Sequence, residues 1–144
     1  TGELIWEMPV KCSYDWYNNG GTLSTPVLGK HDIDNLVIYN ISRTGDNNNG
    51  TKLIALDRQT GNEVWSLNLD YYSWSSPVDV YTESGKSYLV FFDSGGYMYL
   101  IEGKSGKILD RISVEANVEA SPVVYDNMVV IGTRGQVIYG IKIK

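Results

Sequence analysis

A strand-rich unit recurs along this chain, and its period limits the folds that the chain can adopt. The marker Ser/Thr-Pro-Val occurs at residues 25–27, 76–78 and 121–123, and its prolines are 51 and 45 residues apart. Blades of β-propellers have periods of this size, whereas leucine-rich and helical-pair repeats are shorter. The spacing therefore predicts a repeat protein made of propeller blades.

Short apolar runs alternate with clusters of Gly, Asn, Asp and Ser, and this pattern is typical of strands and turns rather than helices. We expect an all-β fold with three antiparallel blades, of which the first two have four strands. Blade 1 covers residues 23–69, with strands near 23–28, 36–41, 52–57 and 62–69. Blade 2 covers 74–114, with strands near 74–80, 87–92, 97–102 and 107–114. Blade 3 covers 119–142, with strands near 119–125, 128–132 and 136–142, and it lacks an outer strand.

The missing outer strand has a counterpart at the other end of the chain. Residues 3–8 align with residues 62–67 and are predicted to form the outer strand of a preceding or closing blade. Such phasing lets a propeller join its first and last blades by backbone hydrogen bonds. Because propellers have about 4–8 blades, three make only a partial ring. Two explanations stay open: remaining blades of a longer chain, or a homodimer of six blades.

The residue types in the run 55–65 explain how the chain can reverse between the third strand and the outer strand. Gly61 permits a positive φ where the chain reverses, and Asp57 can accept hydrogen bonds from the N–H groups of the turn. Trp65 is large enough to pack between two sheets, and the small Ala55 leaves room for its ring. We therefore expect Ala55, Asp57, Thr60, Gly61 and Trp65 to have structural roles.

This run resembles the pyrroloquinoline-quinone-type propeller repeats, whose hallmark is Ala-x-Asp-x-x-Thr-Gly-x-x-x-Trp. Residues 55–65 match it at every defined position, and Trp6 with residues 1–2 matches its second half. The resemblance implies that each Trp is docked between its own Ala and the turn of the next blade. The third occurrence departs from the motif, so docking is not expected between blades 2 and 3; the substitutions are Leu100, Glu102, Ser105 and Asp110.

The resemblance implies two kinds of function. Some relatives are quinone-dependent dehydrogenases, and others bind no quinone and act as assembly scaffolds or as surface and sensor domains. The dehydrogenases hold their quinone against a disulfide of adjacent cysteines, beside a calcium ion. Cys12 is the single cysteine here, so that disulfide cannot form, and its own pairing with another chain stays open. We therefore expect no cofactor and no enzymatic activity. A dehydrogenase fragment remains the catalytic alternative.

Composition excludes further classes. A formal net charge of −5 and an isoelectric point near 4.7 argue against nucleic acid or anionic membranes as partners. No apolar run reaches the length of a membrane span.

His31 lies in a predicted turn with Asp32 and Asp34, which we interpret as a solvated hairpin tip. Residues 46–50 resemble half a calcium loop, but Asp57 stands where the bidentate Glu belongs, so no metal site is predicted.

Aromatic residues gather in the segments between blades, which share one end of a propeller with the loops joining second to third strands. Rigidly held Tyr and Trp beside polar groups are typical of recognition surfaces. The candidate binding residues are Tyr14, Trp16, Tyr17, Arg43, Tyr71, Tyr72 and Trp74. We expect a non-catalytic binding or scaffold module for a protein or glycan ligand, located outside the cytoplasm. The alternative is a purely structural or oligomerisation unit in which Tyr72 and Trp74 fill the space between blades.

Overall fold

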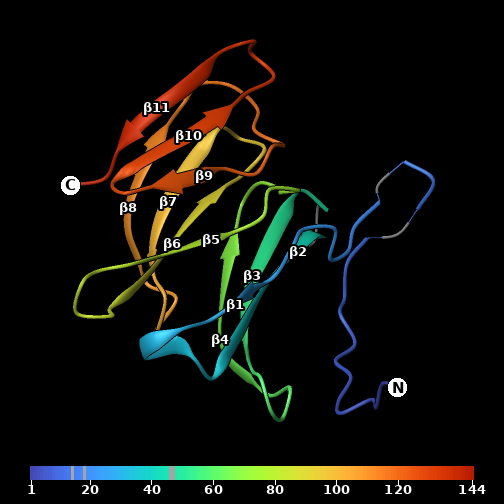
Figure 1. Cartoon of the computed structure of the whole chain (residues 1–144). Coiled ribbons are helices and arrows are strands. Elements are labelled where there is room, and N and C mark those ends of the chain that lie inside the picture. The colour runs from blue at the N-terminus through green and yellow to red at the C-terminus, as the bar shows by residue number, and fades with distance from the viewer. Residues whose placement is uncertain (14, 18, 46–47) are drawn as a thin grey trace.

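Three antiparallel β-sheets follow one another along the chain in the computed structural model (Figure 1). The structure describes residues 1–13, 15–17, 19–45 and 48–144. The helical content of this part is a single 3₁₀ turn, η1 (His31–Ile33). The predicted all-β class is therefore confirmed, and so is the arrangement in blades.

Each predicted blade corresponds to one sheet. Blade 1 contains β1 (Val27–Leu28), β2 (Leu36–Thr44), β3 (Gly50–Asp57) and β4 (Glu63–Leu69), hydrogen-bonded in that order. Blade 2 contains β5 (Val78–Tyr81), β6 (Ser87–Phe92), β7 (Tyr97–Glu102) and β8 (Ile108–Ser113). Blade 3 contains β9 (Val123–Tyr125), β10 (Met128–Gly132) and β11 (Ile138–Lys142), and within the described residues β11 pairs only with β10.

The inner strands are shorter than predicted. We expected strands from residues 23, 74 and 119, but β1, β5 and β9 begin at Val27, Val78 and Val123. Each first residue directly follows the proline of the marker. Proline has no N–H to donate to a neighbouring strand, so ladder pairing starts only after it.

Apolar side chains fill the space between neighbouring blades. Between blades 1 and 2, β2, β3, β6 and β7 provide a buried cluster that includes Ile38, Leu53, Leu89 and Phe91. Between blades 2 and 3, a second cluster includes Phe92, Val118, Val129 and Ile131. Successive residues of one strand thus serve different interfaces: Phe91 faces blade 1 and Phe92 faces blade 3, because side chains alternate across a strand.

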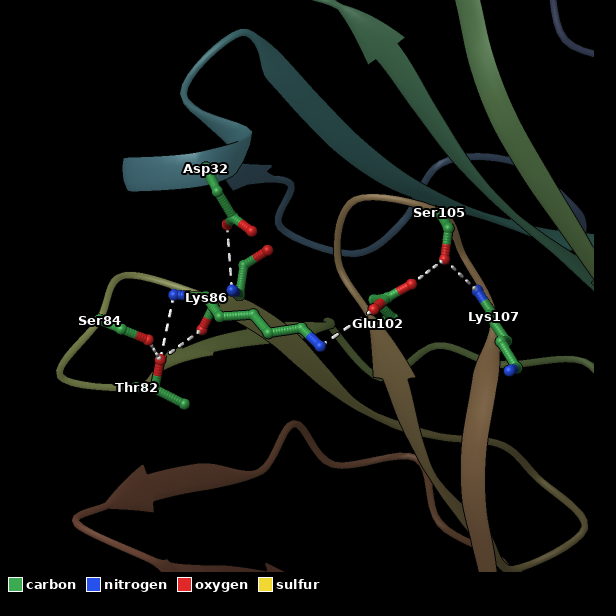
Figure 2. A network of polar contacts seen from close by, with 8 residues as sticks. Asp32, Thr82, Ser84, Lys86, Glu102, Ser105 and Lys107 are labelled. Carbon is green, nitrogen blue, oxygen red and sulfur yellow. Dashed lines mark hydrogen bonds and ion pairs between the residues drawn. The ribbon is translucent and has the colours of Figure 1, made fainter.

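A polar network joins blades 1 and 2 at the end of the sheets where η1 lies (Figure 2). The Asp32 carboxylate accepts the Ser87 N–H at 3.0 Å. In blade 2, Lys86 forms an ion pair with Glu102 at 3.2 Å, and Ser105 donates to the same carboxylate. His31 lies in this region and packs edge-on against Tyr81, with ring centroids 4.9 Å apart. The turn is therefore an inter-blade contact as well as a hairpin tip.

Residues 3–8 form no strand within the described part of the chain. Trp6 and Met8 nevertheless pack against a buried apolar group on blade 1 that contains Val37, Ile41 and Ile54. Cys12 is a free thiol that packs on the same group. The expected pairing of residues 3–8 with a further blade stays a prediction.

The recurring Ser/Thr-Pro-Val marker has a structural role that the sequence did not reveal. The Thr25 N–H donates to the Ser76 hydroxyl oxygen at 2.9 Å, and the Ser76 N–H donates to the Ser121 hydroxyl oxygen at 2.9 Å. The first two markers thus tether their blades to the next one.

We expect Ser76→Ala to lower the free energy of unfolding by about 1 kcal/mol, because it removes one of these tethers and leaves the Thr25 N–H without its acceptor. Urea denaturation measures this change. Ser76→Thr keeps the hydroxyl and is the matched control. Equal destabilisation by both variants would show that the hydroxyl is not responsible.

Candidate functional site

Two tryptophans lie in equivalent positions on the turns of successive blades. The Trp65 Nε1–H donates to the Gly103 carbonyl at 3.0 Å, and the Trp6 Nε1–H donates to the Arg58 carbonyl at 3.0 Å. The two acceptors hold the same place in the repeat, one residue after Glu102 and Asp57 respectively. Trp65 is also the cross-strand partner of Ala55. These contacts are the docking geometry that the motif implies.

The glycine of each turn provides the surface on which the indole ring lies. A Cβ on Gly61 would come within 2.7 Å of the Trp6 ring, and a Cβ on Gly106 within 2.5 Å of the Trp65 ring. Both glycines have positive φ, 73° and 72°. Glycine is therefore required at these positions by backbone conformation and by the close approach of the ring.

The turn of blade 2 keeps its shape although its motif departs from the family pattern. The Gly106 N–H donates to the Glu102 carbonyl at 2.9 Å, as the Gly61 N–H does to the Asp57 carbonyl at 2.8 Å. Backbone hydrogen bonds thus preserve the turn that receives Trp65. Asp110, which replaces the next tryptophan, is exposed and docks on nothing in the described structure.

Asp57 organises the turn of blade 1 through its charge. Its Oδ1 accepts the Thr60 N–H at 2.8 Å, the Thr60 hydroxyl at 2.9 Å and the Gln59 N–H at 3.0 Å. These hydrogen bonds, with the Thr60 N–H contributing most, hold the pKa of Asp57 below its ordinary value of 3.8.

A lowered pKa means that the ionised carboxylate stabilises the fold above pH 3.8, and that this contribution disappears as the pH falls through the folded-state pKa. We expect Asp57→Asn, which keeps an acceptor but has no charge, to lose less stability than the parent between pH 7 and pH 3. Urea midpoints of both proteins at the two pH values provide the measurement. Equal losses would contradict the assignment.

The segment between blades 1 and 2 is anchored by buried polar groups at the loop end, which we define as the end of the sheets carrying the inter-blade segments and the β2–β3 and β6–β7 loops. The Asn40 amide donates to the Ser73 carbonyl at 2.7 Å, and the Ser73 hydroxyl donates to the Phe92 carbonyl at 2.7 Å. Ser73 and Ser75 are fully buried. They flank Trp74, whose side chain is 36% exposed.

Arg43 links this segment to blade 1. A register shift in β2 lies between Ser42 and Thr44, and Arg43 has φ 58°. Bulges of this kind redirect a side chain out of the regular ladder. The Arg43 guanidinium lies 4.1 Å from the ring centre of Tyr72 and 6.0 Å from that of Trp74.

A second stack lies on the blade 2 side. Tyr71 packs against Tyr97 with ring centroids 5.8 Å apart, and the Arg111 guanidinium lies 4.2 Å from the ring centre of Tyr97. Gly95 lets the Tyr71 ring lie close, since a Cβ there would come within 2.6 Å of it. Tyr72 therefore belongs to the stack with Arg43 on the blade 1 side of the junction. Tyr71 belongs to the stack with Tyr97 and Arg111 on the blade 2 side.

Asp93 holds the backbone of Tyr97, one of the rings of the second stack. It is fully buried, its Oδ2 accepts the Tyr99 hydroxyl at 2.7 Å, and its Oδ1 accepts the Tyr97 N–H at 3.1 Å. Burial raises the pKa of Asp93, although these hydrogen bonds act in the opposite direction. The buried carboxyl thus fixes the loop that carries Tyr97.

We call Asp15, Trp16 and Tyr17, which lie in the segment before β1, the aromatic finger. Its base is held by hydrogen bonds from the Ser13 N–H to the Arg43 carbonyl at 2.9 Å and from the Gly20 N–H to the Ser13 carbonyl at 2.7 Å. Trp16 and Tyr17 are 90% and 89% exposed. Tyr14 and the central residues of the 46–49 loop lie outside the described residues.

The structure thus brings Arg43, Tyr71, Tyr72 and Trp74 together at one end of the blade junction, and it attaches the base of the finger to Arg43. Arg43 lies in the bulge of β2 rather than in the loop that follows. The sequence interpretation missed Asn40 and Ser73, although the Ser-Trp-Ser spacing around Trp74 was a signal. It also missed Arg111, for which no signal existed. Within the described residues, no group of His, Cys, Asp and Glu side chains could hold a metal ion.

The docked tryptophans and the blade architecture define a propeller of the pyrroloquinoline-quinone repeat type. A family model described as outer membrane protein assembly factor BamB matches residues 48–144, and the chain belongs to that family. The chain is 33% identical over 136 residues to the outer membrane protein assembly factor BamB of Shewanella oneidensis, covering 93% of this chain and 28% of that protein.

Solved structures show the same fold. The crystal structure of BamB from Moraxella catarrhalis superimposes with a TM-score of 0.61 at 18% identity, over 90% of this chain and 35% of that one. The computationally designed protein Ika8 gives a TM-score of 0.55 at 18% identity, over 76% of this chain and 31% of that one. The chain thus spans about a third or less of the length of these relatives.

Proposed function

We propose that this chain is a non-catalytic protein-binding module outside the cytoplasm, with a role in the assembly of outer membrane proteins. The family supports a scaffold that interacts with other proteins. The observation that carries the proposal is the loop end, where Tyr71 and Trp74 remain partly exposed although buried hydrogen bonds of Ser73 fix the segment that carries them. Rigid aromatic side chains bind partners at a small cost in conformational entropy.

Site-specific photo-crosslinking in the envelope of a Gram-negative bacterium tests this proposal. A photoreactive residue at Tyr17 should crosslink to components or clients of outer membrane protein assembly. The same residue at Tyr125 should not, although Tyr125 is 81% exposed, because it lies on blade 3 away from the loop end. Equal crosslinking from both positions, or none from Tyr17, would contradict the proposal.

The other predicted roles have their own tests. A glycan ligand would bind the loop end in a sugar panel and lose affinity in the variant Trp16→Leu/Tyr17→Leu. A dehydrogenase fragment would oxidise alcohols or sugars when quinone and Ca²⁺ are added, and we expect no such oxidation.

No helix in the described structure is long and apolar enough to cross a membrane.

Self-assembly is a second candidate, and one observation favours it. Trp6 lies on the turn of blade 1 as Trp65 lies on the turn of blade 2, which supports the proposal that residues 3–8 are the outer strand of a preceding blade. A second copy could pair its β11 with this segment, which would give a homodimer of six blades. Sedimentation equilibrium tests this directly. A monomer at all concentrations would instead point to the remaining blades of a longer chain.

A further inference from the structure

The two segments that precede inner strands β1 and β5 share a sequence feature. Asp15-Trp16-Tyr17 and Asp70-Tyr71-Tyr72 each place a carboxylate directly before two aromatic residues. Both triplets lie at the loop end, and three of their four rings are at least one-third exposed: Trp16, Tyr17 and Tyr71 at 90%, 89% and 37%. The feature therefore combines negative charge with accessible aromatic faces.

The same surface already holds cations on its rings. The guanidinium of Arg43 lies over Tyr72 and that of Arg111 over Tyr97, at 4.1 and 4.2 Å from the ring centres. Attraction between a cation and an aromatic face is strongest for tryptophan and largest where water is excluded. Two intramolecular examples at one end of the molecule show that this environment accommodates guanidinium groups. The exposed faces of Trp16 and Tyr17 offer the same chemistry to another molecule.

The overall charge favours a cationic partner. The chain carries a formal net charge of −5, which attracts a basic segment over distances of about a Debye length, roughly 8 Å at physiological ionic strength. Next to the rings, Asp70 adds a local negative charge. Glu119, on the blade 3 side of the loop end, adds none, because it is paired with Arg134 at 2.9 Å. The negative charge would repel an acidic partner. A neutral partner would use neither this charge nor cation–π stacking on the exposed rings.

We propose that the loop end binds an extended, arginine- or lysine-containing segment of a partner protein, whose cationic side chains stack on Trp16, Tyr17 and Tyr71. This inference rests on the proposed function and names the chemistry of the partner. The finger supplies the most accessible rings, and Asp15 and Asp70 supply the carboxylates that directly precede the stacking rings. Arg43 holds the base of the finger through its carbonyl and covers Tyr72 through its side chain, so it positions the surface and does not contact the partner.

Binding to three synthetic peptides of equal length tests the inference: an arginine–glycine, a serine–glycine and a glutamate–glycine repeat. Titration followed by tryptophan fluorescence and by NMR at physiological salt should show that the arginine–glycine peptide binds most tightly. Trp16→Leu/Tyr17→Leu keeps the charge and apolar character of the finger but removes both rings. We expect it to weaken arginine–glycine binding about tenfold, with an unchanged melting temperature.

Two further variants separate ring stacking from general attraction between opposite charges. Tyr125→Leu removes an equally exposed ring outside the loop end and should bind like the parent. Asp70→Asn should weaken binding and reduce its dependence on salt. Loss of affinity in Tyr125→Leu equal to that in Trp16→Leu/Tyr17→Leu, or no loss in the latter, overturns the inference. Equal affinity for all three peptides, lost on removal of the two rings, overturns the cationic partner but leaves the proposed protein-binding function intact.

Discussion

Replacement of Trp65 by alanine is expected to lower the free energy of unfolding by about 3–5 kcal/mol. The side chain is only 9% exposed, it lies on Gly106, and its Nε1–H donates to the Gly103 carbonyl. Removing it leaves a cavity between blades 1 and 2 and takes away the donor of the Gly103 carbonyl. Chemical denaturation followed by circular dichroism measures the change.

Trp6→Ala is the matched control, because Trp6 makes the same two contacts on the equivalent turn of blade 1. Its side chain is only partly buried, so its loss should cost clearly less. If the two variants were equally destabilised, burial between blades would not be the main contribution of Trp65. If Trp65→Ala cost below about 1 kcal/mol, docking would not stabilise the blade junction at all.

Replacement of Asn40 by leucine is expected to cost about 2 kcal/mol, because it leaves the buried Ser73 carbonyl without its donor. Asn40 is 1% exposed, and its carbonyl oxygen also accepts the Thr51 hydroxyl. Urea denaturation measures the cost. Because the Ser73–Ser75 segment holds Trp74 in place, the variant should accelerate hydrogen exchange in residues 70–76 more than in blade 1.

Asn68→Leu serves as the control for this second prediction. Asn68 lies exposed on β4 of the same blade, and its replacement should change stability by less than about 0.5 kcal/mol. An equal cost for both asparagines would show that the effect comes from the added leucine. Unchanged exchange in residues 70–76 of Asn40→Leu would show that the segment is held by other contacts.

The repeat period and the docking motif were sufficient to predict the architecture. In the structure Ala55 pairs with Trp65 across the ladder and Gly61 has a positive φ. Sequence could point to these positions because a small side chain, a positive φ and a large ring are local properties. The inner strands were predicted too long, because we extended them through the residues before each proline, where ladder pairing does not form. The turn of blade 2 shows the reverse case, since its backbone hydrogen bonds persist although four residues of its motif differ from the family pattern.

The candidate site followed less completely from the sequence. Exposure of Trp16 and Tyr17 agrees with their place in a long polar segment. Arg43 of β2 stacks on Tyr72 in the segment between blades, and Arg111 of β8 stacks on Tyr97 of β7. No local pattern in the sequence encodes these contacts. In the sequence, nothing distinguishes Asn40 from other strand residues. Only the structure shows that its buried amide donates to the Ser73 carbonyl in the segment between the blades.

The sequence by itself determined the fold class, the blade period and the residues of the docking motif, because strand alternation, turn chemistry and repeat spacing act over a few neighbouring residues. The tertiary structure alone decided which aromatic rings are covered by cations and which remain exposed. That outcome depends on a bulge in β2 and on buried hydrogen bonds between residues more than thirty positions apart. Such contacts form only when neighbouring blades pack.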